Sequence, residues 1–385
     1  MKYHAVEHIM DQLDIEVFSA STVGPLGGLE EVYILREQRG DLSGFEPKPE
    51  FRSKPNQVIE GAKSVISIAV PYGIKNRKSS GAPRGFVTNM AWEFDYHKVV
   101  NEKLDQIKEA LLQAHPDGNF LSSVDTGPVN DRVVAYGSGL GWIGRNQFVL
   151  DERIGSGFYI GIIITDFEIE GAKDWRESFE SKCGTCKKCQ NSCPANALTG
   201  DYDFHGQKCI STLTQLKRVL TYDERHRIGR NMYGCDICQW ACPYNNQVSK
   251  IQEELVRHTR NTLEPFEILK LSNKSFKREF GQMGFAWRGL KVFKRNALIV
   301  IGNDKQDEDI ERLKSIIWSL SEDLISYGLY AMMMIHPMKT IAYLESNSEK
   351  SEDIEDWLNE CTQILQWMRY KYRNLGDEIK ENWLF

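Results

Sequence analysis

Cysteine is the residue type in this sequence whose spacing most clearly predicts chemistry. Eight of the nine cysteines fall between Cys183 and Cys242. The first four lie in CGTCKKCQNSCP, which has the pattern C-x2-C-x2-C-x3-C-P, and the last three lie in CDICQWACP, which repeats its ending. Thiolates at such short spacing bind zinc or iron. We therefore expect a metal-binding module in a compartment that keeps thiols reduced.

The first run has the spacing of bacterial ferredoxins, in which three thiolates hold one 4Fe-4S cluster and the fourth ligates another. This crossover predicts two ligand sets: Cys183, Cys186, Cys189 and Cys242 for the first cluster, and Cys193, Cys209, Cys235 and Cys238 for the second. Two structural zinc sites are the alternative, because they also use C-x2-C pairs. Iron-sulfur clusters carry electrons without doing group chemistry themselves, so another part of the chain must use those electrons.

A glycine-rich segment, GSGLGWIG, satisfies G-x-G-x-x-G at Gly139, Gly141 and Gly144, with Asp166 further along. A dinucleotide site requires this motif to open a helix. The residues that follow, RNQFVLDERIGSG, are soon interrupted by Gly155. We therefore interpret the segment as a turn that lets backbone approach backbone or a flat cofactor.

The segment VDTGPV contains an Asp-Thr-Gly triplet at Asp125. Aspartic proteases need two carboxylates that share a proton, and the single copy here excludes that class. From spacing alone, Asp125 is a turn or cap residue, with catalysis as the alternative.

Short β-branched runs and one amphipathic stripe predict a mixed N-terminal region. SVISIAV (64–70) and GFYIGIIIT (157–165) are typical of buried strands, and residues 92–112 place apolar side chains at helical spacing. The fold class is therefore α+β, with a first domain over 1–170, a cysteine module over 171–250 and a helical domain over 251–385. Metal ligation must supply much of the folding energy of the middle module.

The sequence pattern of the C-terminal part predicts helices. Residues 354–372 keep the rhythm of a long amphipathic helix, with Cys361 on its apolar stripe, so we expect Cys361 to be a core residue without a function. Two further helices, 289–301 and 308–320, are joined by the polar turn GNDKQD. This pair suggests a helical-repeat hairpin, although one pair does not establish a solenoid.

A basic segment lies within this acidic chain. Residues 270–300 hold eight basic side chains and one acid, Glu279, although the net charge is −6. Clustered Lys and Arg bind phosphates of nucleic acids. The alternative is a solvated helix face.

The length of 385 residues, 41% of them apolar, suggests two or three domains at roughly 150 residues each. The longest apolar runs fall short of the ~20 residues that span a bilayer. The start, MKYHAVEHIMDQLD, lacks the basic and then apolar stretch of a signal peptide. We expect a cytoplasmic monomer with no membrane segment.

Six motifs together resemble the epoxyqueuosine reductases, cobalamin-dependent enzymes that complete queuosine in tRNA. These motifs are VDTGPVNDR, GLGWIGRN, DYHKV, CGTCKKCQNSCP, CISTLTQLK and YGCDICQWACP, and the resemblance covers at least Arg52 to Pro243. It implies a nitroreductase-like cobalamin domain, a ferredoxin-like domain with two 4Fe-4S clusters and a C-terminal HEAT-like helical domain.

The reaction implied by the resemblance converts the epoxide of epoxyqueuosine to the cyclopentene of queuosine with loss of water. The clusters pass electrons to cobalamin, and an external flavodoxin or ferredoxin-like protein supplies them. Asp125 is implied as the acid that protonates the departing oxygen. The partner is a tRNA that carries epoxyqueuosine.

The resemblance also implies residue roles. The cobalamin pocket would be lined by Arg52, Thr88, Asp95, Tyr96, His97, Asp125, Val149, Ser211, Gln215, Lys217 and Asp236. We interpret His97 as a structural residue rather than a cobalt ligand. The best candidates for tRNA contact are Arg288, Lys291, Lys294 and Arg295.

Three other classes remain as alternatives. A reductase of the reductive dehalogenase type uses the same two cofactors, but the absent export signal and the basic helical part argue against it. A ferredoxin-like electron-transfer module would bind no cobalamin. A nucleic-acid-binding repeat protein with structural metals would hold no iron.

Overall fold

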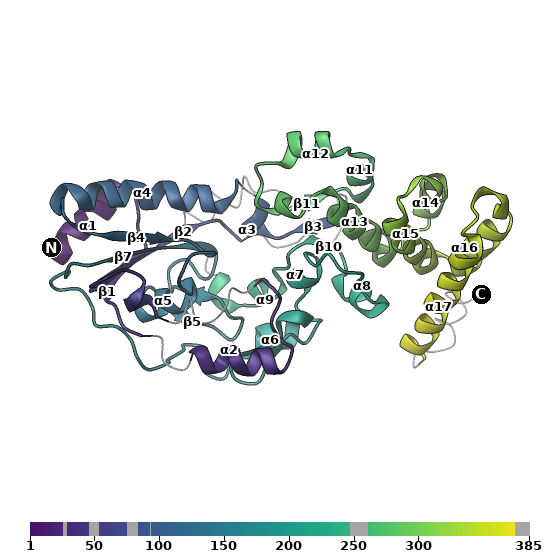
Figure 1. The fold of residues 1–385 in the computed structure, drawn as a ribbon. Coiled ribbons are helices and arrows are strands. Elements are labelled where there is room, and N and C mark those ends of the chain that lie inside the picture. The colour runs from purple at the N-terminus through teal and green to yellow at the C-terminus, as the bar shows by residue number, and fades with distance from the viewer. Residues whose placement is uncertain (26–28, 46–53, 75–83, 93, 247–260, 374–385) are drawn as a thin grey trace.

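The computed structural model describes residues 1–25, 29–45, 54–74, 84–92, 94–246 and 261–373. The molecule is elongated, with a layered region of sheet and helices at the N-terminal end and a helical region at the C-terminal end (Figure 1). The cysteine-rich segment lies between these two ends, below a small second sheet.

A four-stranded antiparallel sheet forms the centre of the N-terminal region. Its strand order is β1 (Phe18–Thr22), β2 (Ser64–Pro71), β7 (Phe158–Thr165) and β4 (Phe120–Ser123). The two predicted strands are its central pair, in register from Ser64 opposite Thr165 to Pro71 opposite Phe158. Every residue of β7 is buried because helices cover both faces of the sheet.

The pleat of the strands sends alternate residues to opposite helical layers. Ile66 and Ile163 face α1 (Tyr3–Gln12) and α4 (Tyr96–Ala114), whereas Val65 and Ile162 face α5 (Asp131–Gly137). The expected helix over 92–112 is divided into a short α3 (Asn89–Trp92) and α4. The division arises because Asp95 caps α4, with its side chain accepting from the backbone N of His97.

A second, three-stranded sheet joins the three parts of the sequence. It has the order β10 (Asn231–Tyr233), β3 (Gly85–Val87) and β11 (Thr262–Leu263), with β3 parallel to β10 and antiparallel to β11. Around it, Val87, Met232 and Phe285 belong to one hydrophobic core. The part after residue 251 is therefore not purely helical, and the three expected domains share a core at this sheet.

The cysteine-rich segment is built from short elements, as expected for a module held by metal ligation. They are α6 (Lys188–Ser192), β8 (Leu198–Thr199), β9 (Asp203–Phe204), η3 (Gly206–Lys208), α7 (Ile210–Leu213), α8 (Tyr222–Ile228), α9 (Ile237–Trp240) and η4 (Pro243–Asn245). Four further short elements precede them in the chain: α2 (Leu29–Gln38), η2 (Pro55–Gln57), β5 (Trp142–Ile143) and β6 (Val149–Leu150).

The C-terminal region is a stack of helices. They are α11 (Pro265–Lys270), α12 (Asn273–Phe280), η5 (Gly284–Arg288), α13 (Leu290–Asp304), α14 (Asp309–Ile316), η6 (Ile317–Ser319), α15 (Glu322–Ile335), α16 (Pro337–Glu345), η7 (Ser348–Lys350) and α17 (Ile354–Lys371). No helix in the described ranges is both long and apolar enough to cross a membrane.

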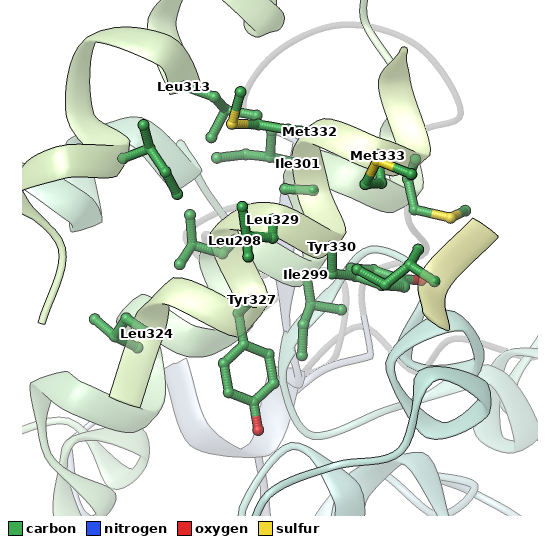
Figure 2. Packing of buried hydrophobic residues seen from close by; sticks show 14 of the residues in the cluster. Leu298, Ile299, Ile301, Leu313, Leu324, Tyr327, Leu329, Tyr330, Met332 and Met333 are labelled. Atoms are coloured by element: carbon green, nitrogen blue, oxygen red, sulfur yellow. The ribbon is translucent and has the colours of Figure 1, made fainter. Parts of the chain in front are cut away.

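The main partner of α13 differs from the predicted one. Helix α13 continues to Asp304 and ends at Lys305, which has a left-handed φ of 54°. It packs on α15 rather than mainly on α14, because Gly302 allows the two backbones to approach closely: a Cβ there would lie 2.8 Å from the Ala331 Cα. Figure 2 shows side chains of both helices, among them Leu298 and Tyr330, in this interface.

The prediction for the last helix is confirmed. Helix α17 buries Trp357, Cys361, Ile364 and Met368 along one stripe. Cys361 is fully buried in the same core as α13 and α15, where a free cysteine acts as a small apolar side chain.

Candidate functional site

Asp125 stands on the loop that follows β4, in a conformation that few non-glycine residues adopt. Its φ is 41°, and such left-handed backbone at an ordered residue commonly marks a functional site. The hydroxyl of Tyr96 donates a hydrogen bond to Asp125 Oδ2 at 2.5 Å. His97 Nε2 lies 4.0 Å from the same oxygen. The Asp125 carboxylate remains 48% exposed, so it can meet a ligand.

The first turn of α4 positions the groups around Asp125. Asp95 Oδ1 accepts from the backbone N of His97 at 3.1 Å and lies 2.8 Å from His97 Nδ1. His97 thus lies between two carboxylates. Tyr96 stacks on Tyr159, with ring centroids 5.0 Å apart and an interplanar angle of 10°. Burial and the charge of Asp125 raise the pKa of Tyr96, so the tyrosine stays protonated and keeps its role as donor.

A second arm reaches the same place from the cysteine-rich segment. The Tyr233 hydroxyl donates to Gln215 Oε1 at 2.9 Å and accepts from Trp287 Nε1 at 2.5 Å. Gln215 Nε2 in turn donates to the Ser211 carbonyl at 3.0 Å. Burial raises the pKa of Tyr233 to about 12, and the charges of Asp125 and Asp95 act in the same direction. The Tyr233 hydroxyl therefore lies close enough to the carboxylates of Asp125 and Asp95 to feel their charges.

The thiols gather into two groups that match the two crossed sets. Burial raises the pKa of Cys189 to about 11, and Cys183 and Cys242 lie nearby. Burial likewise raises the pKa of Cys235, whose neighbours include Cys209 and Cys193. Thiols in such surroundings bind as thiolates only when a metal offsets their charge.

The thiols of the second set are shielded from water more strongly than those of the first set. Burial raises the pKa of Cys238 well above its usual value, with Cys235, Cys209 and Cys193 nearby. The cysteine side chains of this set still retain some accessible surface. In the part of the chain that the structure describes, no three His, Cys, Asp or Glu side chains lie close enough together to hold one metal ion. Four thiolates on separate irons of one cluster are also spread more widely than four on one zinc ion.

Two arginines from other parts of the fold hold the backbone beside the two sets. Arg145, in the glycine-rich turn, donates to the carbonyls of Gly184 at 2.8 Å and Cys186 at 3.3 Å. Arg295, on α13, donates to the carbonyls of Leu213, Thr214 and Leu216 near the end of α7.

Arg295 corrects one prediction. Its side chain is buried, and its guanidinium donates to backbone carbonyls, so it is a structural residue and offers no charge to a nucleic acid. Lys291 is exposed and forms an ion pair with Asp323. Lys294 is half-buried, and burial lowers its pKa. Arg288 lies over the rings of Phe45 and Trp287.

Several residues implied in the cobalamin pocket do not present a side chain to the loop of Asp125. Asp236 is buried and accepts from Thr88 Oγ1, from Asn89 N at 2.8 Å and from Asn89 Nδ2 at 2.7 Å. Burial raises its pKa. Asp236 therefore joins the second cysteine set to the start of α3.

The other residues implied in the cobalamin pocket lie in different surroundings. Val149 belongs to β6 and is buried in a hydrophobic core, and Lys217 is exposed. Arg52 lies outside the described residues.

The glycine-rich motif is a turn between α5 and β5, as predicted. A Cβ at Gly141 would collide with the Leu150 carbonyl, and Gly139 has a φ of 82°. Asp166 does not approach this turn, since its carboxylate accepts from Asn119 N at 3.0 Å and from Asn119 Nδ2 at 2.7 Å. The motif does not form a dinucleotide site.

Sequence reasoning missed Tyr233, Trp287, Phe45 and Arg145 as residues of this region. Tyr233 stands in YGCDICQWACP and Arg145 in GLGWIGRN. In both motifs only the cysteines and glycines were interpreted as site residues. Trp287 and Phe45 belong to no motif, and only the folded chain brings them to the site.

Comparison with known proteins supports the identity of both parts. Residues 182–245 match the model of the 4Fe-4S double cluster binding domain, and residues 52–126 match that of epoxyqueuosine reductase QueG, DUF1730. The middle segment is thus a domain for two 4Fe-4S clusters, in agreement with the prediction and against the zinc alternative.

Relatives and solved structures agree with these models. The epoxyqueuosine reductase of Bacillus subtilis is 32% identical, over 89% of this chain and 90% of its own. A crystal structure of an epoxyqueuosine reductase with an epoxyqueuosine-modified tRNA-Tyr stem loop has a TM-score of 0.83 at 29% identity, over 94% of this chain and 99% of that chain. A Bacillus subtilis structure, whose aspartate-bearing catalytic loop is swung out of the active site, has a TM-score of 0.80 at 29% identity, over 94% and 99%.

The epoxyqueuosine reductase of Staphylococcus aureus is 33% identical, over 83% of this chain and 84% of its own length. With this relative, the two matching domain models and the similar solved structures, the chain belongs to the epoxyqueuosine reductase family.

Proposed function

We propose that this protein reduces epoxyqueuosine to queuosine in the anticodon of tRNA. The observation that carries the proposal is the position of Asp125, exposed on a strained loop and hydrogen-bonded to Tyr96, beside the Tyr233 arm of the cluster domain. The pairing of a positioned carboxyl with a domain for two 4Fe-4S clusters supports the proposal. Family membership supplies the substrate class.

The balance of the reaction fixes what each part must supply. Removal of the epoxide oxygen consumes two electrons and two protons and releases one water, and the two ring carbons become an alkene. The oxygen leaves poorly as an alkoxide, so a positioned acid must give it a proton in the transition state. Asp125 is that acid. The Tyr96 hydroxyl then donates to the resulting carboxylate and stabilises its charge.

Residues of the two arms offer groups that suit a corrin. Ser211 and Gln215, which belong to the Tyr233 arm, offer a hydroxyl and an amide for the peripheral amides of cobalamin, and Tyr96 offers an aromatic face. The exposed ammonium of Lys217 would suit its phosphate. Bound cobalamin would supply a strongly reducing centre beside the substrate. The side chains named here would orient it and exclude water, and the Nε2 atom of His97 is directed toward Asp125 rather than free to bind cobalt.

The remaining parts have roles that follow from charge and exposure. Arg288, Lys291 and Lys294 would contact tRNA phosphates, and the helices from α13 to α17 would form a HEAT-like domain next to a nitroreductase-like one. The domains would run over 1–170, 171–250 and 251–385, although they share the core at β3. We place the protein in the cytoplasm as a monomer that receives electrons from a flavodoxin or ferredoxin-like donor.

The test uses anaerobic protein loaded with iron, sulfide and cobalamin, dithionite as reductant and an epoxyqueuosine-bearing stem-loop. The product is read by mass as the loss of one oxygen. Asp125→Asn should slow turnover by about 10²- to 10⁴-fold, because it removes a general acid. Its iron content and corrin spectrum should equal those of the wild type.

Asp166→Asn is the matched control, since this carboxylate lies at the far end of β7 and contacts Asn119. It should turn over at the wild-type rate. Full activity of Asp125→Asn would refute the assignment of the acid. Failure of the loaded wild type to bind cobalamin would favour an electron-transfer module instead.

A further inference from the structure

We propose that Trp287 and Arg288 form a stacking site for a nucleobase of the substrate RNA, next to the nucleotide that enters the active site. This inference rests on the proposed function and deepens it, because it assigns a recognition role to two residues outside the reacting centre. Trp287 is 59% exposed, although a tryptophan of this size normally hides most of its surface.

The segment that carries Trp287 is firmly anchored, so the exposure of its ring is not a consequence of a loose loop. Phe285, two residues earlier, is fully buried and packs on Trp92 and Tyr233, with ring centroids 5.7 and 6.2 Å away. The backbone N of Asp95 donates to the carbonyl of Gln282 at 2.9 Å. The 3-10 helix η5 is thus attached to the segment that begins α4.

A hydrogen bond to Tyr233 fixes the orientation of the Trp287 indole. Its Nε1 donates to the Tyr233 hydroxyl at 2.5 Å, and Tyr233 is within electrostatic range of Asp125 and Asp95. The segment of Trp287 is also tied through Gln282 to Asp95, the residue before Tyr96, whose hydroxyl donates to Asp125. A base stacked on the indole would be adjacent to a nucleotide that reaches Asp125.

Arg288 completes the stacking surface. Its guanidinium carbon lies 3.9 Å from the centroid of the Trp287 ring and 4.5 Å from that of Phe45. Among the residues that the structure describes, this guanidinium forms no ion pair, and its Nε has no hydrogen-bond partner. A flat cation held between aromatic rings, with its charge unpaired, suits an RNA that offers both bases and phosphates.

Two other exposed rings belong to neighbouring segments: Phe45 contacts Trp287, with ring centroids 6.2 Å apart, and Phe94 pairs through its backbone with Met283, just before η5. Phe94, on the segment before Asp95, is 60% exposed, and Phe45 is 38% exposed. Single-stranded loop bases are typically held by stacking on aromatic rings and on arginine planes. Lysines alone would suffice for contact with phosphates, whereas exposed rings beside an arginine also suit the flat faces of bases.

The experiment measures binding of an anticodon stem-loop that carries 2-aminopurine beside the modified nucleotide. Cluster-loaded protein is titrated anaerobically, and the fluorescence of the probe gives both affinity and stacking. Trp287→Ala should weaken binding roughly 10-fold and remove the quenching of 2-aminopurine. Trp287→Phe should keep most of both, because a ring remains.

Arg288→Lys separates stacking from charge. It keeps the positive charge and should therefore keep the salt dependence of binding, but it should lose affinity because lysine has no plane. Tyr370→Ala is the matched control: Tyr370 is 67% exposed and lies 4.8 Å from the Arg373 guanidinium, on α17. It should bind like the wild type, with the quenching unchanged.

The outcomes distinguish this site from the proposed function. Wild-type affinity and quenching in Trp287→Ala, in a protein that reduces epoxyqueuosine normally, would overturn the stacking site and leave the function standing. Quenching that depends on Trp287 in a protein without turnover would support the site and refute the function. A wild type that does not bind the stem-loop would refute both.

Discussion

The two cysteine sets use the same ligand spacing but lie in very different surroundings. In the first set, the residues around Cys186 are exposed, among them Gly184, Lys187 and Lys188. In the second set, the neighbours of Cys235 and Cys238 are buried, among them Asp236 and Gln239. Identical motif chemistry thus lies beside exposed residues at Cys186 and beside buried residues at Cys235 and Cys238, while Cys189 of the first set is the one buried thiol of the eight.

This difference suggests a direction for electrons. A cluster at the rim can receive electrons from another protein, whereas a cluster in the core can pass them only to a group inside the molecule. The second set is also joined, through Asp236, to Asn89 at the start of α3. We therefore expect the first cluster to be the entry point and the second to be the delivery point.

The largest effect should come from removing one ligand of each set. Cys238→Ala should lose roughly half of the iron and all turnover with either reductant, because the delivery cluster is missing. Cys186→Ala should lose a similar share of iron and turnover with a protein donor, but keep turnover with dithionite, a small reductant that can reach the second cluster directly. Iron assays and both turnover assays check this. Equal loss with dithionite would contradict the division into entry and delivery clusters.

The second effect concerns the two arginines that hold the loops. Arg295→Met should lower the free energy of unfolding by about 1–3 kcal/mol, because buried carbonyls of Leu213 and Thr214 lose a donor. Arg145→Met should cost less, since water can reach the exposed carbonyl of Gly184. Denaturant unfolding of the cluster-loaded variants measures both. A larger cost for Arg145→Met would show that the rim set is the better buried one.

The smallest effect concerns the exposed lysines beside the first set. Reversing Lys187 and Lys188 to glutamate should slow turnover with an acidic donor protein by several-fold at low salt and flatten its salt dependence, because charge complementarity mainly governs association rate. Turnover with dithionite should stay unchanged. Stopped-flow reduction at two salt concentrations measures the effect, and Lys208→Glu beside the second set serves as control. If Lys208→Glu were the slower variant, the donor would not dock at the first set.

Prediction from sequence succeeded where a local pattern carries the information. The strands over 64–70 and 157–165, the stripe of α17 and the buried Cys361 followed from periodicity alone. The site was predicted in the same way only in part. Asp125 and the start of α4 were identified through their motifs, while Arg295 was taken for a surface cation.

Arg295 illustrates why charge alone was insufficient. Four basic residues, Arg288, Lys291, Lys294 and Arg295, share one short segment, yet Arg288 ends η5 and the other three lie at different positions around α13, so their surroundings differ. One guanidinium lies between rings, one ammonium pairs with Asp323, and Arg295 donates to carbonyls from α7. A sequence reports the charges of such a segment but not which of them remain free.

The sequence by itself determined the cluster chemistry, because thiolate ligation depends on short spacings that the local backbone can satisfy. It also determined the strands and helices with a strong apolar period. The surroundings of each cysteine set and the position of Trp287 beside Tyr233 depend on the tertiary structure. The physical reason is that burial and contact between segments far apart in the chain depend on the packing of whole elements, and α13, β3 and the loop of Asp125 meet only in the folded protein.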